Sequence, residues 1–225
     1  VDLSNPAQPR LIGNLPRTQG SPPSVWRDIK VLNDHAYIVA DGAGAHGMQV
    51  FDLTLLRTVG DAPVVFEPDT TYHNIHSAHN VVADTAAGFL YIVGANSGGQ
   101  TCGGGLHMVD ARDPKKPAFA GCYNDRLGSN NRGYTHDAQC LTYNGPDTRY
   151  RGKEICFNAS ETAVVTSERR RTPRGVGPMM ETRSARVRVT CSSRCASSMS
   201  TPVTRSARGR SRSRSRFVSA RRTAP

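Results

Sequence analysis

The sequence predicts an all-β protein built from a repeat of about 50 residues, followed by a tail of different composition. Two short motifs recur in step along residues 1–166. The segments between them are short, rich in β-branched and aromatic residues, and separated by Gly, Asn, Asp and Pro, as is typical of strands and turns. Residues 167–225, by contrast, contain no Leu, Ile, Lys, Asp, Asn, Gln, His, Tyr or Trp.

The repeat is defined by two markers that keep a similar period. The first is an apolar residue followed by aspartate, at Asp2, Asp52 and Asp110, which are 50 and then 58 residues apart. The second is a polar pair that opens a strand, and its first members are 52 and then 57 residues apart. Two independent markers in phase indicate a true repeat. The three polar pairs are Arg27-Asp28, His79-Asn80 and His136-Asp137.

The unit that begins at residue 79 shows the expected elements most clearly. Its apolar runs predict strands at about 79–84, 89–96, 105–111 and 117–123. Four short strands in about 50 residues is the size of a propeller blade. We therefore expect residues 1–166 to form a partial β-propeller of about three blades, each a four-stranded antiparallel sheet. A β-sandwich is the alternative, although it does not require two markers to repeat in phase.

The positive charge of the chain is confined to the tail. Residues 1–166 contain 13 Lys and Arg against 16 Asp and Glu, whereas residues 167–225 contain 16 Arg against two Glu. We expect the tail to be a disordered, Arg/Ser-rich segment, because it has too few apolar residues to offset the entropy of ordering. One interpretation is a shift of reading frame in the coding sequence. The other is a genuine element, centred on residues 208–216, that binds RNA or is phosphorylated on serine.

Four phrases of residues 1 to about 165 resemble the LVIVD-repeat proteins of the choice-of-anchor B family. The resemblance implies a propeller in an exported protein that is held at the cell surface by a C-terminal anchor, and it implies no catalytic residues. The chain departs from the family pattern after Val165. Because Val1-Asp2-Leu3 matches the middle of a repeat, we expect a fragment without its leader and anchor. The four phrases are Trp-Arg-Asp-Ile-Lys-Val at 26–31, Tyr-His-Asn-Ile-His-Ser-Ala-His-Asn at 72–80, Gly-Gly-Leu-His-Met-Val-Asp at 104–110 and Gly-Tyr-Thr-His-Asp-Ala-Gln-Cys at 133–140.

Four cysteines lie in the repeat region, two in each of two successive units. On the expected strands Cys102 and Cys122 can approach each other, and Cys140 and Cys156 lie on neighbouring strands. Two local disulfides fit an exported protein. The alternative is four buried free thiols in a protein of a reducing compartment. No close Cys-x-x-Cys pair of the zinc-binding kind occurs in this region.

Three histidines within seven residues form the most suggestive metal-binding pattern. His73, His76 and His79 provide ligands for Zn²⁺ or Cu²⁺ if a turn gathers them. On a flat strand, a spacing of three directs successive side chains to opposite faces, so the pattern requires a loop. The alternative is that His79 is a repeat-position residue and the other two bond locally. Turn residues such as Asp41 and Asp84 are candidate Ca²⁺ ligands, although forming turns is their ordinary role.

The repeated polar pairs suggest a second site. In a propeller the first strand of each blade lines the central channel, so the pairs would form a ring at one mouth. The structural interpretation is that each pair bonds the neighbouring blade. The residues of this expected ring are Arg27, Asp28, His79, Asn80, His136 and Asp137.

The function expected from the sequence is that of an exported, extracellular or cell-surface module that binds a surface protein or glycan, or acts as a scaffold. An enzyme with its site at the channel mouth is the alternative, with His79 and His136 as acid, base or metal ligands. A third possibility is RNA binding through the tail, and we expect a nucleic-acid partner only if the tail is genuine. No apolar run of about 18 residues is present to span a membrane.

Overall fold

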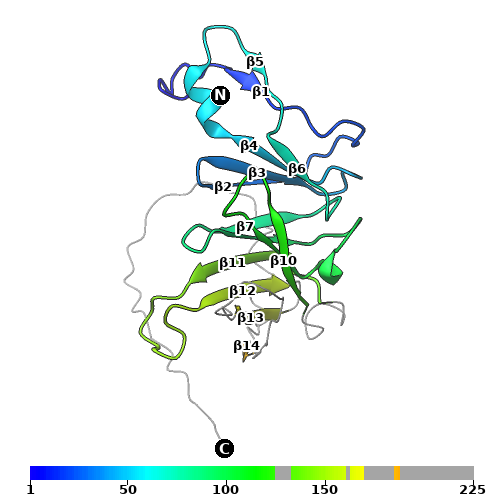
Figure 1. Cartoon of the computed structure of the whole chain (residues 1–225), viewed down its shortest axis with the longest axis vertical. Coiled ribbons are helices and arrows are strands. Elements are labelled where there is room, and N and C mark those ends of the chain that lie inside the picture. Colours follow the sequence, from blue (N-terminus) through cyan, green and yellow to red (C-terminus); the bar gives the residue numbers. More distant parts are fainter. Residues whose placement is uncertain (125–132, 161–162, 170–184, 188–225) are drawn as a thin grey trace, which may run out of the picture. The chain divides into compact units, whose positions relative to one another are not determined.

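The computed structural model describes residues 1–124, 133–160, 163–169 and 185–187 (Figure 1). These residues form strands and turns, with only two short 3-10 helices, η1 (Leu53–Thr58) and η2 (Cys102–Gly104). The predicted all-β class is therefore confirmed. In the described part of the chain, no helix has the length and apolar character needed to cross a membrane.

The first sheet has four antiparallel strands in chain order. Its first hairpin is joined by Asn33 and Asp34, which both have positive φ, 50° and 57°. Asn and Asp are the non-glycine residues that most readily adopt this conformation, which a two-residue type I′ turn requires. The strands are β2 (Arg27–Leu32), β3 (His35–Ala40), β4 (Met48–Asp52) and β6 (Thr70–Tyr72).

The middle sheet repeats this arrangement and contains the four strands predicted for the unit at residue 79. The strands are slightly shorter than expected. The second ends at Val93 rather than residue 96, because the chain turns at Gly94, where φ is +62°. The strands are β7 (Asn80–Asp84), β8 (Phe89–Val93), β9 (Leu106–Asp110) and β10 (Ala118–Tyr123).

The third sheet continues past the boundary that we expected at residue 166. Its third strand runs to Arg169, and the carboxylate of Glu168 is buried and paired with Lys153 at 2.9 Å. A short fourth strand follows within the segment expected to be disordered. The rest of that segment, 170–184 and 188–225, lies outside the described residues. The strands are β11 (Asp137–Thr142), β12 (Glu154–Ser160), β13 (Ala163–Arg169) and β14 (Ala185–Val187).

A small parallel sheet joins the N-terminal segment to the first unit. It pairs β1 (Gly13–Asn14) with β5 (Val64–Val65). Alanine or any larger residue at position 13 would collide with the chain beside it, because a Cβ there would lie 2.7 Å from the carbonyl oxygen of Val64. Glycine therefore permits this close approach of two backbones.

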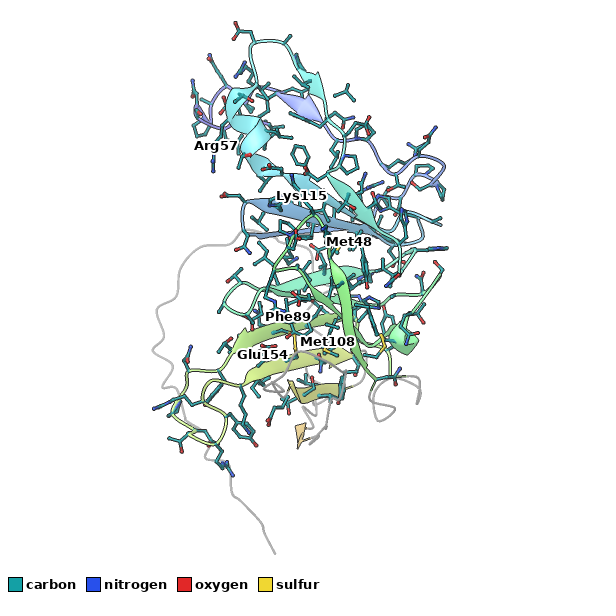
Figure 2. All side chains as sticks on the ribbon, in the orientation of Figure 1. Met48, Arg57, Phe89, Met108, Lys115 and Glu154 are labelled. Atoms are coloured by element: carbon teal, nitrogen blue, oxygen red, sulfur yellow. A yellow bond between two sulfur atoms is a disulfide. The ribbon has the colours of Figure 1, made fainter. Side chains whose placement is uncertain are left out.

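Two apolar clusters form the core, and together they cover both faces of the middle sheet. Tyr37 of the first sheet and Val81 of the middle sheet belong to one cluster. Phe89 and Met108 of the middle sheet, labelled in Figure 2, belong to the other with Cys140 of the third sheet. The strand β8 is consequently buried along its whole length. An apolar run without alternation is what a strand covered on both faces requires.

Candidate functional site

The expected polar ring was assigned to the first strands of the three units, and these strands are neighbours. The strand β7 contacts both β2 and β11. The three sheets can be aligned by their strand register, because in each sheet the second member of the polar pair is paired with an apolar residue of the next strand. These pairs are Asp28 with Val39, Asn80 with Val93, and Asp137 with Ala159.

Asp28 links the first sheet to the middle sheet. Its carboxylate accepts the backbone N–H of Val81 at 3.0 Å and that of Ile29 at 2.9 Å. Lys30 donates to the same carboxylate at 2.6 and 2.7 Å. Because β7 is the edge strand of its sheet, the carboxylate satisfies an amide that no strand of that sheet can reach. The carboxylate of Asp28 is therefore occupied by the contact between the sheets.

The other ring residues differ in what they contact. Asn80 donates a long hydrogen bond, 3.4 Å, to the carbonyl of His136 on the third sheet. Asp137 is exposed and accepts the N–H of Ala138 at 2.7 Å. Arg27 lies on the opposite face of β2 from Asp28 and donates to Nε2 of the buried His46 at 3.0 Å. The structure thus brings His79, Asn80 and His136 together but uses Arg27 elsewhere.

His79 lies in a small polar cluster formed by all three units. Its Nδ1–H donates to the carboxylate of Asp41 at 2.9 Å, and Asn96 donates to the other oxygen of Asp41 at 2.8 Å. The ring of His136 lies 4.2 Å from the ring of His79, centroid to centroid. In the neutral imidazole, this hydrogen bond selects the tautomer with the proton on Nδ1 and the lone pair on Nε2. A carboxylate that orients an imidazole in this way is typical of metal-binding and acid-base histidines.

The three histidines expected to share a metal ion are not gathered. His76 packs over Gly98, where even a Cβ would meet its ring at 2.0 Å, and His73 lies beside Gly47. His79 instead faces Asp41 and His136. Within the described residues, no group of three or more His, Cys, Asp or Glu is arranged to hold a metal ion. The spacing of three in sequence separates these side chains, as an extended chain requires.

The two disulfides expected from the sequence are present. Cys102 bonds Cys122 across 20 residues, and Cys140 bonds Cys156 across 16. The second pair occupies directly opposed positions of β11 and β12. Each bond stays within one unit, so each closes a short loop in the unfolded chain.

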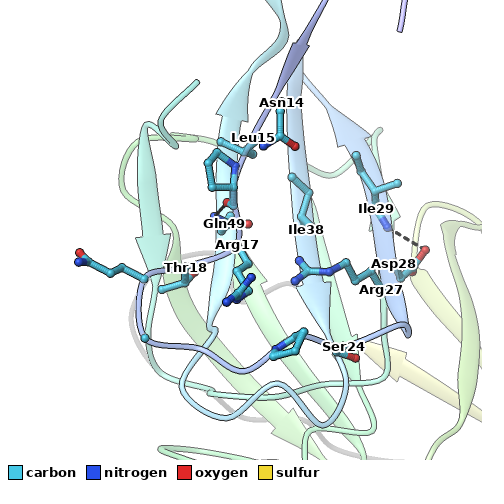
Figure 3. Close-up of a pocket in the computed structure, with 14 residues that line it drawn as sticks. Asn14, Leu15, Arg17, Thr18, Ser24, Arg27, Asp28, Ile29, Ile38 and Gln49 are labelled. Atoms are coloured by element: carbon cyan, nitrogen blue, oxygen red, sulfur yellow. Dashed lines mark hydrogen bonds between the residues drawn. The ribbon is translucent and has the colours of Figure 1, made fainter. Parts of the chain in front are cut away.

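A pocket of about 940 Å³ opens on the face of the first sheet that is turned away from the middle sheet (Figure 3). The segment 14–20 forms one side, and the floor is formed by Ile29, Ile38 and Gln49. Arg17 and Arg27 also line it, and their side chains point toward its interior in Figure 3. The pocket was not predicted, because a gap between a sheet and a loop depends on how the loop is laid across it.

Two buried histidines were also missed by sequence reasoning, and both are held neutral. His46 accepts from Arg27 and donates Nδ1–H to the carbonyl of Gly47 at 2.9 Å. His107 accepts the hydroxyl of Tyr72 at 2.8 Å and donates Nδ1–H to the carbonyl of Gln100 at 2.6 Å. Burial lowers the pKa of both imidazoles, and it raises the pKa of Tyr72 to about 12, so the phenol remains a donor.

Comparison with models of protein families, with curated proteins and with solved structures finds no match for this chain.

Proposed function

We propose that this chain is part of an exported, cell-surface β-propeller that acts as a binding or scaffold module. The observation that carries the proposal is the repetition of one sheet-to-sheet contact. The first strand of each sheet contacts the first strand of the next, and an apolar cluster fills the space between each pair of sheets. Radially packed, four-stranded meanders with neighbouring first strands are the geometry of propeller blades.

Two further features support this function. The disulfides favour an oxidising compartment, where such bonds persist. The resemblance of residues 1 to about 165 to choice-of-anchor B proteins points to the same location. A propeller offers loops at one end of its sheets for holding a surface protein or a glycan, and rigid scaffolds commonly bind through such loops.

A binding screen tests this proposal. The whole labelled chain, prepared with its disulfides intact, is applied to an array of glycans and purified extracellular proteins. We expect saturable binding that is unchanged by EDTA, because no group of three or more His, Cys, Asp or Glu in the described residues is arranged to hold a metal ion. Binding only to polyanions, lost at high salt, would contradict the proposal and indicate contacts through the arginine-rich tail.

The second candidate is an enzyme or metal-binding site at His79 and His136. The specific observation in its favour is the polar cluster, in which Asp41 fixes the tautomer of His79 and the two imidazoles lie 4.2 Å apart. The two imidazoles would supply two of the three protein ligands that a catalytic Zn²⁺ site commonly uses, with Asp41 as the residue that orients His79.

Calorimetric titration of the chain with Zn²⁺ tests this second candidate. If the site exists, binding is saturable and is lost in His136→Ala, while His35→Ala, at a half-buried histidine of β3 outside the cluster, leaves it unchanged. Equal heats for the two variants would exclude the pair as a metal site. A pH-rate profile is then the measurement for any activity found in a substrate screen.

A further inference from the structure

Aligning the three sheets by their register identifies one aromatic position in each. The position compared on β2, β7 and β11 lies two residues after the second member of the polar pair. On the next strand of each sheet, the residues paired with this position are Tyr37, Tyr91 and Phe157, respectively. Tyr37 and Tyr91 have no exposed surface, because each is covered by the sheet that follows its own. Phe157 is 42% exposed. The face of the third sheet that points away from the middle sheet is called the far face. It therefore exposes an aromatic side chain whose equivalents in the other two sheets are buried.

The opposite face of the first sheet shows the complementary pattern. Val81 and Ile92 are paired on the face of the middle sheet that meets the first sheet, and both are completely buried. Their equivalents are Ile29 and Ile38, which pair in the same register. Ile29 is 55% exposed, and both residues line the pocket of about 940 Å³. The face of the first sheet that points away from the middle sheet is called the near face. It has the apolar residues that the middle sheet uses to pack on the sheet before it.

We propose that two copies of this chain associate head to tail, with the far face of the third sheet of one copy packed on the near face of the first sheet of the other. The contact would continue a series that occurs twice within the chain, between the first and middle sheets and between the middle and third sheets. It places Phe157 of one copy against Ile29 and Ile38 of the other.

Polar groups on the two faces are also complementary. Between the first and middle sheets, the carboxylate of Asp28 accepts the N–H of Val81. The equivalent carboxylate on the far face is the exposed Asp137, and the equivalent position on the near face is Ile29, whose own amide donates to Asp28. The negative Asp137 would then approach an edge strand that begins with the positive Arg27. Opposite charges favour this contact over one between two near faces, which would bring Arg27 of one copy against Arg27 of the other.

The N-terminal segment leaves room for this partner. The side chain of Gln49 donates to the carbonyl of Pro16 at 2.8 Å. In the middle sheet, the register position of Gln49 is occupied by His107, which bonds the hydroxyl of Tyr72 on β6. The segment around Pro16 therefore contacts the near face of the first sheet at the position where β6 contacts the middle sheet. The part opposite Ile29 and Ile38 is the open pocket, and the inner strands of the other copy's sheet would lie there.

The number of copies rests on the proposed propeller. A head-to-tail contact uses different patches on its two sides, so it closes only if the rotation from sheet to sheet completes a ring. The described residues of two copies supply six four-stranded sheets, within the range of four to eight blades found in propellers. We therefore expect a closed assembly of two copies.

The mass of the assembly, measured by light scattering after size-exclusion chromatography of the whole chain, tests this proposal. Ile29→Lys disables the near face and Phe157→Lys disables the far face, each at an exposed side chain. We expect the mass of two copies for the unaltered chain and of one copy for either variant. An equimolar mixture of the two variants should recover two copies, because one intact near face then meets one intact far face.

Each outcome separates the docking contact from the propeller. Large assemblies that grow with concentration, and that either variant abolishes, would support the contact but contradict the closed propeller. A single-copy mass for the unaltered chain would overturn the contact. So would a two-copy mass for Phe157→Lys, which would indicate that near faces pair with each other. Leu55→Lys, at an exposed leucine of η1, is the matched control and should keep the original mass.

Discussion

At the scale of single residues, the polar side chains between the sheets act chiefly as partners for buried groups. His107 and His46 each use both ring nitrogens, one as donor and one as acceptor. Burial lowers the pKa of each imidazole, so the folded protein disfavours the proton that an unfolded histidine binds below pH of about 6.5. These two residues therefore couple the free energy of unfolding to pH.

The sign of this coupling gives a prediction. Below pH of about 6.5 the unfolded chain binds more protons than the folded chain, so the free energy of unfolding falls as the pH falls toward the lowered folded pKa values. Thermal unfolding measured between pH 8 and pH 5 should show this decrease. In His107→Gln, which places the residue of the equivalent position Gln49, the dependence should be weaker. An unchanged slope would show that His107 titrates normally in the folded protein.

Asp28 offers a second prediction at the same scale. Asp28→Ala leaves the N–H of Val81 without its acceptor and should reduce the free energy of unfolding by about 1–3 kcal/mol. Asp137→Ala is the matched control at the equivalent position, where the described contact is the local one to Ala138. Urea denaturation of both variants under dilute conditions measures the difference. Equal losses would mean that the bond to Val81 adds nothing to the local hydrogen bond that each carboxylate accepts from the next residue.

At the scale of elements, most strands could be predicted from the sequence, and the contacts between sheets could not. The apolar runs and turn residues of the unit at 79 predicted β7 to β10 within a few residues, because alternation and turn chemistry are local. The pairing of Cys140 with Cys156 followed from the neighbouring strands expected in the next unit, which are β11 and β12. The grouping of His79 with Asp41 and His136 depends on three sheets meeting, which no local pattern encodes. His73 and His76, by contrast, are separated from His79 by a local cause, the spacing of three along an extended chain.

The disulfides give a prediction for individual sheets. Replacing Cys140 and Cys156 together with serine should reduce the free energy of unfolding by about 3 kcal/mol, because it releases a short loop in the unfolded chain. Peptide mapping without reductant should recover the pairs 102–122 and 140–156. Cys191→Ser with Cys195→Ser, outside the described residues, is the control and should leave the unfolding of the sheets unchanged. A similar loss in both double variants would contradict this account.

At the scale of the whole molecule, the chain is a series of like sheets followed by a basic segment. The middle sheet is covered on both faces, whereas the first and third sheets each retain an open face with exposed apolar side chains, Ile29 and Phe157. Stability in such a series depends on contacts between neighbours. The end sheets should therefore unfold more readily than the middle sheet whenever their open faces are not covered.

The basic segment gives a prediction that the sheets do not share. If the arginine-rich residues bind RNA, affinity should fall steeply with salt and disappear on removing residues 188–225. The deletion begins after β14, because a cut at residue 167 would remove the end of β13. Fluorescence anisotropy with a single-stranded RNA measures this. Binding that survives the deletion would assign RNA recognition to the sheets instead.

The crystal structure of the whole chain tests whether its sheets are equivalent blades joined through their first strands. If they are, β7 lies between β2 and β11, and the carboxylate of Asp28 accepts the N–H of Val81. The rotation from the first sheet to the middle sheet should then equal the rotation from the middle sheet to the third. Two sheets packed face to face as a sandwich, with β2 and β7 apart, would contradict it.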